Sequence, residues 1–235
     1  MKSIAIRYFT FILGLFFLSM GVDFIVTSAL GTTPISSINY VLSLNFPITL
    51  GTATLLFNLV IIALEFWLVR GKNNRKDIFE ILLQIPFSIL FSIFIDLNLI
   101  WISGLEPGNY PGALTLLAIG CLMQAIGVVL ELKPNVAIMS AEGFVKYYCK
   151  RYNCNFGKVK VYFDVSLVVT AVLLSLIFAS GIQGVREGTV IAALSTGILV
   201  NWLSKHLMTR NTLSLFLYPF MHLQGKAFPQ KPKLF

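Results

Sequence analysis

Apolar runs of about 20 residues recur along almost the whole chain, and they constrain the fold more than any other feature of the sequence. A run of this length crosses the roughly 30 Å hydrocarbon core of a bilayer as an α-helix, because a helix rises about 1.5 Å per residue. The sequence therefore predicts an all-α polytopic membrane protein with six transmembrane helices. The six predicted spans are 8–30, 50–69, 78–102, 112–131, 161–181 and 187–207.

The composition excludes the main soluble classes of protein. Only 12% of the residues are charged and 57% are hydrophobic, whereas soluble proteins have about 25% charged residues. A large soluble domain, a cytosolic enzyme and a nucleic-acid-binding protein are therefore excluded, so no nucleic acid is expected as a partner. The net charge of +8 is interpreted instead as the charge bias that orients helices in a membrane.

The basic residues occupy alternate connections between the predicted spans. They lie before the first span, between the second and third, between the fourth and fifth, and from the end of the sixth onward. Arg186 is the only basic residue on the opposite connections. Because cytoplasmic connections carry the excess of Lys and Arg, both termini are predicted to be cytoplasmic in a bacterial inner membrane.

The two halves of the chain show a weak internal similarity at an offset of 106 residues. Each half has the order long span, short segment, span, span, and three crossings per half make the second half enter from the opposite side. This predicts two inverted repeats, 1–104 and 105–207, a layout typical of secondary transporters, followed by an interfacial and basic cytoplasmic tail, 208–235. The matched pairs are Gly14 with Gly120, Gly21 with Gly127, Val22 with Val128, Gly51 with Gly157, Phe57 with Phe163, and Asn58 with Asp164.

Two short segments, 33–46 and 134–150, interrupt the pattern of spans. The first would reach only about 21 Å as a helix, so it cannot cross the membrane. In one interpretation the two segments are half-helices that enter from opposite faces and point toward a central site. In the other they are amphipathic connectors that lie on the membrane surfaces.

Four stretches carry a resemblance to a known family: Leu30-Gly31-Thr32-Thr33-Pro34, Gly51, Phe163-Asp164 and Gly184-Val185-Arg186-Glu187-Gly188-Thr189. With these landmarks the chain resembles the YitT/YczE (YczE/YyaS/YitT) family of bacterial integral membrane proteins over about 8–207. The resemblance implies a transporter-like or permease-like fold, but no substrate and no established site. The second half departs from the pattern, because Ile138-Met139-Ser140-Ala141-Glu142-Gly143 replaces the Gly-x-x-Pro turn, which puts in doubt whether both halves shape a pocket equally.

Ionisable residues within spans are candidates for a functional site, because a charge at the bilayer centre costs about 2.5–3.5 kcal/mol or more. Asp23 and Asn58 are predicted to meet at similar depth, near hydroxyls of the first short segment, as a substrate or proton site or as a structural hydrogen bond. Glu65 is predicted to snorkel toward Arg70. The candidate substrate-binding residues are Asp23, Thr33, Ser36, Asn39, Asn58, Glu142, Asp164, Arg186 and Glu187.

For the charged candidates of the second half, structural alternatives stay open. Lys160 can form an i,i+4 ion pair with Asp164 at a helix entrance, with Glu142 nearby, instead of a proton relay. Arg186 and Glu187 can attract an anion at the external mouth or anchor the chain at the interface.

Catalytic and nucleotide-binding motifs are not found. His206 and His222 are the only histidines, without HExxH spacing, and the P-loop pattern GxxxxGK[ST] is absent from the sequence. Cys149 and Cys154 are expected to be free thiols. Neither an enzyme activity nor a metal site or cofactor is expected.

The sequence thus predicts a secondary transporter or permease for a small solute. The alternatives are a substrate-binding membrane subunit of an ATP-driven complex and a non-transporting membrane scaffold. The expected partners are the lipid bilayer, a small-molecule solute, a coupling proton or cation, and a second copy of the chain.

Overall fold

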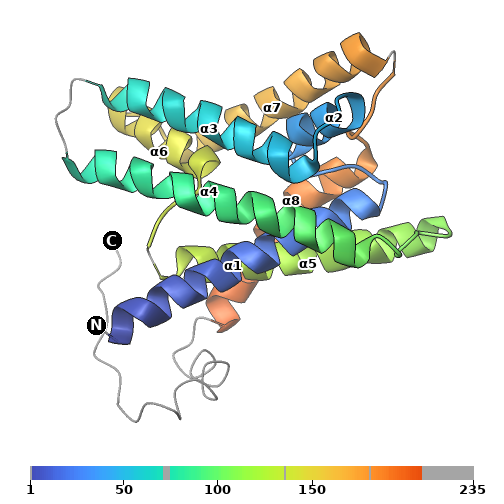
Figure 1. The fold of residues 1–235 in the computed structure, drawn as a ribbon, viewed down its shortest axis with the longest axis horizontal. Helices are drawn as coiled ribbons and strands as arrows, with labels where there is room; N and C mark the ends of the chain where they lie inside the picture. Colours follow the sequence, from blue (N-terminus) through green and yellow to red (C-terminus); the bar gives the residue numbers. More distant parts are fainter. Residues whose placement is uncertain (1, 71–74, 135, 180, 208–235) are drawn as a thin grey trace.

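The computed structural model describes residues 2–70, 75–134, 136–179 and 181–207, and over these ranges the regular structure is helical (Figure 1). The predicted tail 208–235, with His222, lies outside the described residues. The helices are α1 (Lys2–Thr27), α2 (Ser37–Asn45), α3 (Leu50–Val69), α4 (Arg75–Ile102), α5 (Tyr110–Leu132), α6 (Ser140–Tyr152), α7 (Phe156–Ala179) and α8 (Glu187–Leu207).

Among the described residues, five helices are long and apolar enough to cross a membrane: α1, α3, α4, α5 and α7. The chain is therefore a multi-pass, all-helical membrane protein. The sixth predicted span coincides with α8, which has 21 residues but does not belong to these five. Polar residues such as Thr196 and Asn201 interrupt its apolar sequence and lower its average hydropathy.

Local sequence signals explain where several helices begin. Thr49 precedes α3, and its side chain accepts a hydrogen bond from the Thr52 backbone N–H at 3.0 Å. Asn109 does the same for α5 through the Gly112 N–H at 2.8 Å. These caps satisfy backbone donors that have no partner within the first turn of a helix.

Helices α1 and α5 form an antiparallel pair, and glycines bring their backbones together (Figure 1). A Cβ added at Gly120 would lie 2.9 Å from the carbonyl oxygen of Gly21, and one added at Gly127 would lie 2.9 Å from that of Gly14. The four glycines that the internal similarity matches between the two halves therefore face one another across this pair. Only small residues permit such a close approach of helices.

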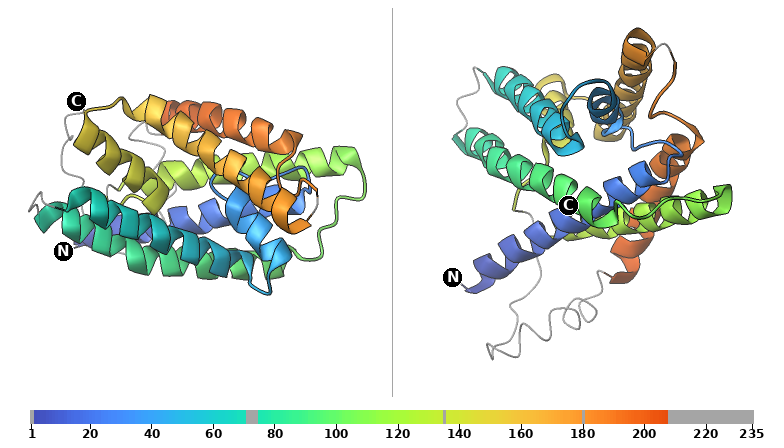
Figure 2. Two further views of the ribbon diagram at one scale, coloured as in Figure 1. Left: turned by 90° about the horizontal axis from the view of Figure 1, so that it is seen from above. Right: turned by 45° about the vertical axis from the view of Figure 1, so that its right-hand side comes forward.

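The remaining contacts are similar in the two halves of the chain: most contacts made by a helix of α1–α4 have a counterpart made by the equivalent helix of α5–α8. Helix α1 packs on α4 and α5 packs on α8; α2 packs on α3 and α7, and α6 packs on α7 and α3. Two contacts break the pattern in the part of the chain that the structure describes. Helix α3 packs extensively on α4, whereas α7 has no comparable contact with α8, and α4 contacts α6, whereas α8 has no comparable contact with α2. Figure 2 shows α7 standing apart from α8.

Candidate functional site

The two loops that carry most of the family-like sequence meet at one end of the molecule. The backbone N–H of Gly188 donates to the Leu30 carbonyl oxygen at 2.8 Å, and that of Thr32 donates to the Thr189 hydroxyl at 3.1 Å. Gly31 has a φ of 134° and lies against Thr189, so a side chain there would be strained and would clash. These contacts fix the segment that leads into α2.

Arg186 and Glu187 lie at this junction rather than in a buried site. The Arg186 guanidinium donates to the Ala29 carbonyl oxygen at 3.2 Å and lies 3.5 Å from the Glu187 carboxylate. Both side chains are about half exposed. The structure thus gives Arg186 a bridging role between the two loops.

The hydroxyls of Thr33 and Ser36 are hydrogen-bonded to each other. The Thr33 hydroxyl donates to that of Ser36 at 3.0 Å and accepts from the Ser36 backbone N–H at 3.3 Å. Both residues are buried. They close the turn before α2, so their hydrogen bonds are local.

Helix α6 begins beside the middle of α3. The Ser140 hydroxyl, at the first residue of α6, donates at 2.7 Å to the side-chain carbonyl of Asn58, near the centre of the 20-residue helix α3. Toward its other end, α6 contacts the last turn of α3, where Arg151 donates to the Leu68 carbonyl oxygen at 2.7 Å. Residues 136–139, which precede α6, are non-helical. They lead the chain to the middle of α3, where α6 begins.

A buried carboxylate lies where α3, α4 and α6 meet. The Glu65 side chain has 0% exposure and accepts a hydrogen bond from the Gln84 amide nitrogen at 2.9 Å. A Cβ at Gly143 would lie 2.5 Å from the second oxygen of Glu65, so only glycine lets α6 approach the carboxylate. The prediction that Glu65 snorkels toward Arg70 is therefore wrong, because α6 covers it.

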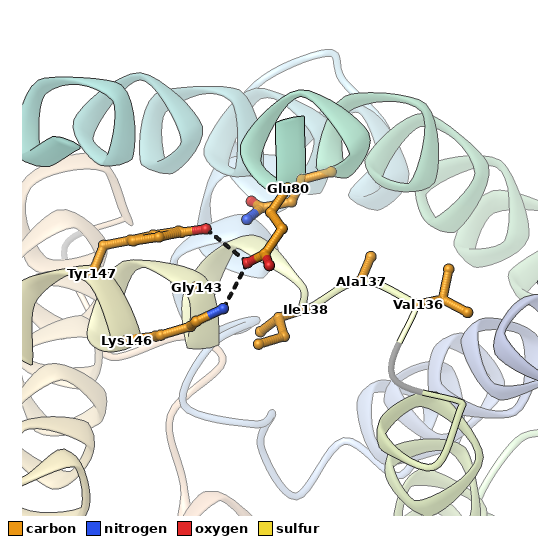
Figure 3. Close-up of a pocket in the computed structure, with 8 residues that line it drawn as sticks. Glu80, Val136, Ala137, Ile138, Gly143, Lys146 and Tyr147 are labelled. Atoms are coloured by element: carbon orange, nitrogen blue, oxygen red, sulfur yellow. Dashed lines mark hydrogen bonds and ion pairs between the residues drawn. The ribbon is translucent and has the colours of Figure 1, made fainter. Parts of the chain in front are cut away.

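A small pocket of about 90 Å³ lies next to this carboxylate, between α4 and the start of α6 (Figure 3). Lys146 and Tyr147 point toward one oxygen of Glu80, with a 2.7 Å ion pair and a 3.1 Å hydrogen bond. Burial raises the pKa of the Tyr147 phenol, and the negative charge of Glu80 raises this pKa further. The phenol thus remains a neutral donor. The full lining is Glu80, Gln84, Val136, Ala137, Ile138, Gly143, Lys146 and Tyr147.

Charged residues of α6 and α7 form a second group beside the pocket. Lys160 lies 2.7 Å from Asp164, which confirms the predicted i,i+4 ion pair, and 3.6 Å from Glu142. Glu131, at the end of α5, is also buried and accepts a hydrogen bond from the Met139 backbone. Glu142 and Asp164 are thus brought together through Lys160, and the pair is consistent with the structural alternative.

Asp23 and Asn39 are fully buried without hydrogen-bond partners among the described residues. Asp23 therefore does not hydrogen-bond to Asn58, whose side-chain oxygen accepts from Ser140 instead. Asp96, the charged neighbour of Asp23, accepts hydrogen bonds from the Gly51 N–H at 2.9 Å and the Thr49 hydroxyl at 2.8 Å. Asp96 thus stabilises the start of α3, whereas Asp23 has no structural partner.

Within the described ranges, no group of three or more His, Cys, Asp and Glu side chains is arranged to hold a metal ion. Cys121, Cys149 and Cys154 are free. Desolvation raises the pKa of the Cys149 thiol, and the neighbouring Cys154 adds to this effect, which lowers its reactivity.

A sequence model of the family described as "Family of unknown function (DUF6198)" matches residues 5–205. The chain belongs to this family. Comparisons with curated proteins and with solved structures gave no match. The resemblance to the YitT/YczE family stays a prediction. The region matched by DUF6198 contains the fully buried carboxylates of Asp23 and Glu65 and the whole lining of the pocket.

Sequence reasoning about this DUF6198 chain missed the residues that form the pocket. Glu80 and Gln84 lie one helical turn apart on α4, and this i,i+4 spacing of polar residues within a predicted span was an available signal. Gly143 was visible only as part of a departure from the family pattern. Nothing in the sequence indicates that Gly143, Lys146 and Tyr147 pack against that turn of α4, because the contact depends on where α6 folds back.

Proposed function

We propose that the chain is a secondary transporter or permease for a small solute. The observation that carries this proposal is that α6 begins beside the middle of α3, at the hydrogen bond between Ser140 and Asn58. Irregular backbone at such depth is tolerated where it lines protein or a wet cavity. The pocket between α4 and α6 and the unpartnered Gln84 carbonyl in its lining support a polar binding site there.

We further propose that α1–α4 and α5–α8 form two inverted repeats with six spans, α8 included. The similar helix contacts of the two halves and the reciprocal approach of Gly14 to Gly127 and of Gly21 to Gly120 support this arrangement. In it, α2 and α6 are half-helices that enter from opposite faces, as the discontinuous helices of transporters do.

The distribution of charge supports an orientation. The start of α1, the end of α3 and the start of α7 lie toward one end of the molecule (Figures 1 and 2), and the basic residues of the chain concentrate in the connections at this end. By the positive-inside rule, this end faces the cytoplasm of a bacterial inner membrane, and both termini are cytoplasmic.

One observation favours the alternative function, a substrate-binding membrane subunit of an ATP-driven complex. Helix α7 exposes a broad apolar surface, with Tyr162, Leu173 and Ile177 among its exposed residues, and within the described residues it has no extensive packing on α8. A second subunit, or a second copy of the chain, would cover such a surface, as lipid also would. A non-transporting scaffold would use the same surface.

A ligand screen on the detergent-purified protein tests the proposed function. A solute held at 100 times its Kd stabilises its binder by about 2.7 kcal/mol, so a thermal-shift panel of metabolites identifies candidates for uptake assays in liposomes. We expect Asn58→Ala and Gln84→Leu to abolish binding without unfolding the protein, and the exposed Glu106→Gln to bind as the wild type does. Wild-type binding by both buried variants contradicts the site assignment. A stable protein that binds nothing but co-purifies with an ATPase supports the alternative.

A further inference from the structure

We propose that the pair Glu65–Gln84 is a proton-binding site, and that Glu65 carries the coupling proton of the transporter. The coupling role rests on the proposed function, whereas proton binding itself does not. The pair joins α3 to α4 directly behind Gly143 of α6. It is therefore placed to link the protonation state of one carboxylate to the position of a short helix.

The hydrogen bonding of the pair is incomplete in one specific way. Gln84 donates to one oxygen of Glu65 at 2.9 Å, while the other Glu65 oxygen and the Gln84 carbonyl oxygen have no partner among the described residues. Both orphaned atoms are acceptors, and leaving a buried acceptor unsatisfied is costly, most of all when it is charged. The missing component at this site is thus a donor.

A proton supplies what the pair lacks. When a hydronium ion in the pocket gives a proton to the free oxygen of Glu65, one O–H bond of the hydronium breaks and an O–H bond of the carboxyl forms. This leaves a neutral water, removes the buried charge and gives the carboxyl a donor. No other bond changes. Hard metal cations prefer about six or more oxygen ligands, whereas the pair offers only two unpartnered oxygens, and Gly143 is packed against one of them. The geometry therefore favours a proton over a metal cation.

The pocket provides a route for the proton. Gln84 and Gly143 belong to the pocket lining, and at its mouth the side chains of Glu80 and Lys146 are 48% and 37% exposed. Protons can thus reach the pair from solvent through a space that has room for several waters.

Charges on both packed helices act on Glu65. On α6, the acidic Glu142 and the basic Lys146 lie within one helical turn of Gly143, the residue packed on Glu65. On α4, Glu80 and Asp77 are held in ion pairs with Lys146 and Lys150, and Tyr147 hydrogen-bonds to Glu80. A movement of α6 therefore changes the charges around the carboxylate, which is what coupling requires.

Infrared difference spectroscopy of the full-length protein, titrated with pH in lipid vesicles, tests the proposal directly. We expect a carboxyl C=O band that grows on acidification in the wild type and is lost in Glu65→Gln. The exposed control Glu106→Gln retains this band, and thermal unfolding verifies that each variant is folded. A pH-dependent band unchanged in folded Glu65→Gln overturns the proposal.

A second variant keeps the test decisive if Glu65→Gln does not fold. Gln84→Leu removes the partner amide but keeps the carboxylate, so we expect the band to persist with a displaced midpoint. An unmoved midpoint shows that the titrating group lies elsewhere and overturns the assignment to this pair.

Sodium distinguishes a proton site from a metal site. Exchange of sodium for choline in the buffer is expected to leave the titration unchanged, whereas sodium-dependent stabilisation that is lost in Glu65→Gln overturns the proposal in favour of a metal cation.

The proposal of transport and the proposal of proton binding can be contradicted separately. A titrating Glu65 in a protein that binds no solute in the screen contradicts transport but not proton binding, and solute uptake without a titrating Glu65 contradicts coupling but not transport.

Discussion

The short helices α2 and α6 occupy corresponding places in the two halves of the chain, yet their surroundings differ in charge. Helix α2 has 9 residues and no charged side chain, and it contacts its neighbours through neutral groups such as the amides of Asn45 and Gln183. Helix α6 has 13 residues, and its lysines pair with Glu80 and Asp77 of α4. Helix α2 is thus held by contacts between neutral groups, whereas α6 is held in part by ion pairs.

The long helices that follow differ in packing. Gly51 in α3 lies against the backbone of Ser92 and the carboxylate of Asp96 in α4, whereas Gly157 in α7 has only the Asn155 side chain nearby, 3.4 Å from an added Cβ. The two glycines match in the sequence comparison, but only one is needed for close packing. A shared residue therefore does not establish a shared role in both halves.

The largest effect is expected at the crossing of α1 and α5, which the two halves share. Gly21→Ala and Gly127→Ala each place a Cβ against the opposite backbone, so each should lower the free energy of unfolding by about 3 kcal/mol. Reversible unfolding in mixed detergent measures this, with Gly104→Ala as a control because its added Cβ meets nothing within 4 Å. Strongly unequal losses would show that the two glycines are not equivalent.

A smaller loss of stability, unequal between the two halves, is expected at the glycines near the starts of α3 and α7. Gly51→Ala should cost about 2 kcal/mol because its Cβ overlaps Asp96 and Ser92. Gly157→Ala should be neutral or stabilising by up to about 1 kcal/mol, because alanine favours a helix more than glycine does. Equal losses in the same assay would contradict the difference in packing between α3 and α7.

The pH dependence of stability should depend on Tyr147 of α6. Its pKa in the folded protein is raised above the ordinary value of 10.0, so its contribution is complete below pH 10 and is lost as the pH rises. We expect the wild type to lose up to about 1.4 kcal/mol per pH unit above pH 10, relative to Tyr147→Phe. Parallel pH profiles of the two proteins would contradict a buried, neutral phenol.

The smallest effect is expected from the exposed ion pair of α6 with α4. Lys146 and Glu80 are both partly exposed, so Lys146→Gln should cost about 0.5 kcal/mol, and added salt should abolish the difference. A loss that persists at high salt would mean that this pair is energetically part of the buried cluster.

The sequence predicted the helices well because long apolar runs report directly on lipid exposure. Span 50–69 coincides with α3. That Gly14, Gly21, Gly120 and Gly127 meet one another is a finding of the structure. The depth of a residue in its span did not predict which side chains meet. Asp23 and Asn58 were placed at similar depth but do not hydrogen-bond, because depth along the membrane normal does not determine which faces of two helices meet.

The sequence by itself determined that this chain is a helical membrane protein and where its long helices lie. These properties follow from hydrophobicity, which acts locally along each helix. Only the tertiary structure decided that α6 folds back to the middle of α3 and covers Glu65 beside Gln84. The burial of a carboxylate depends on which segment packs over it, and a residue's own neighbours in the sequence do not contain that information.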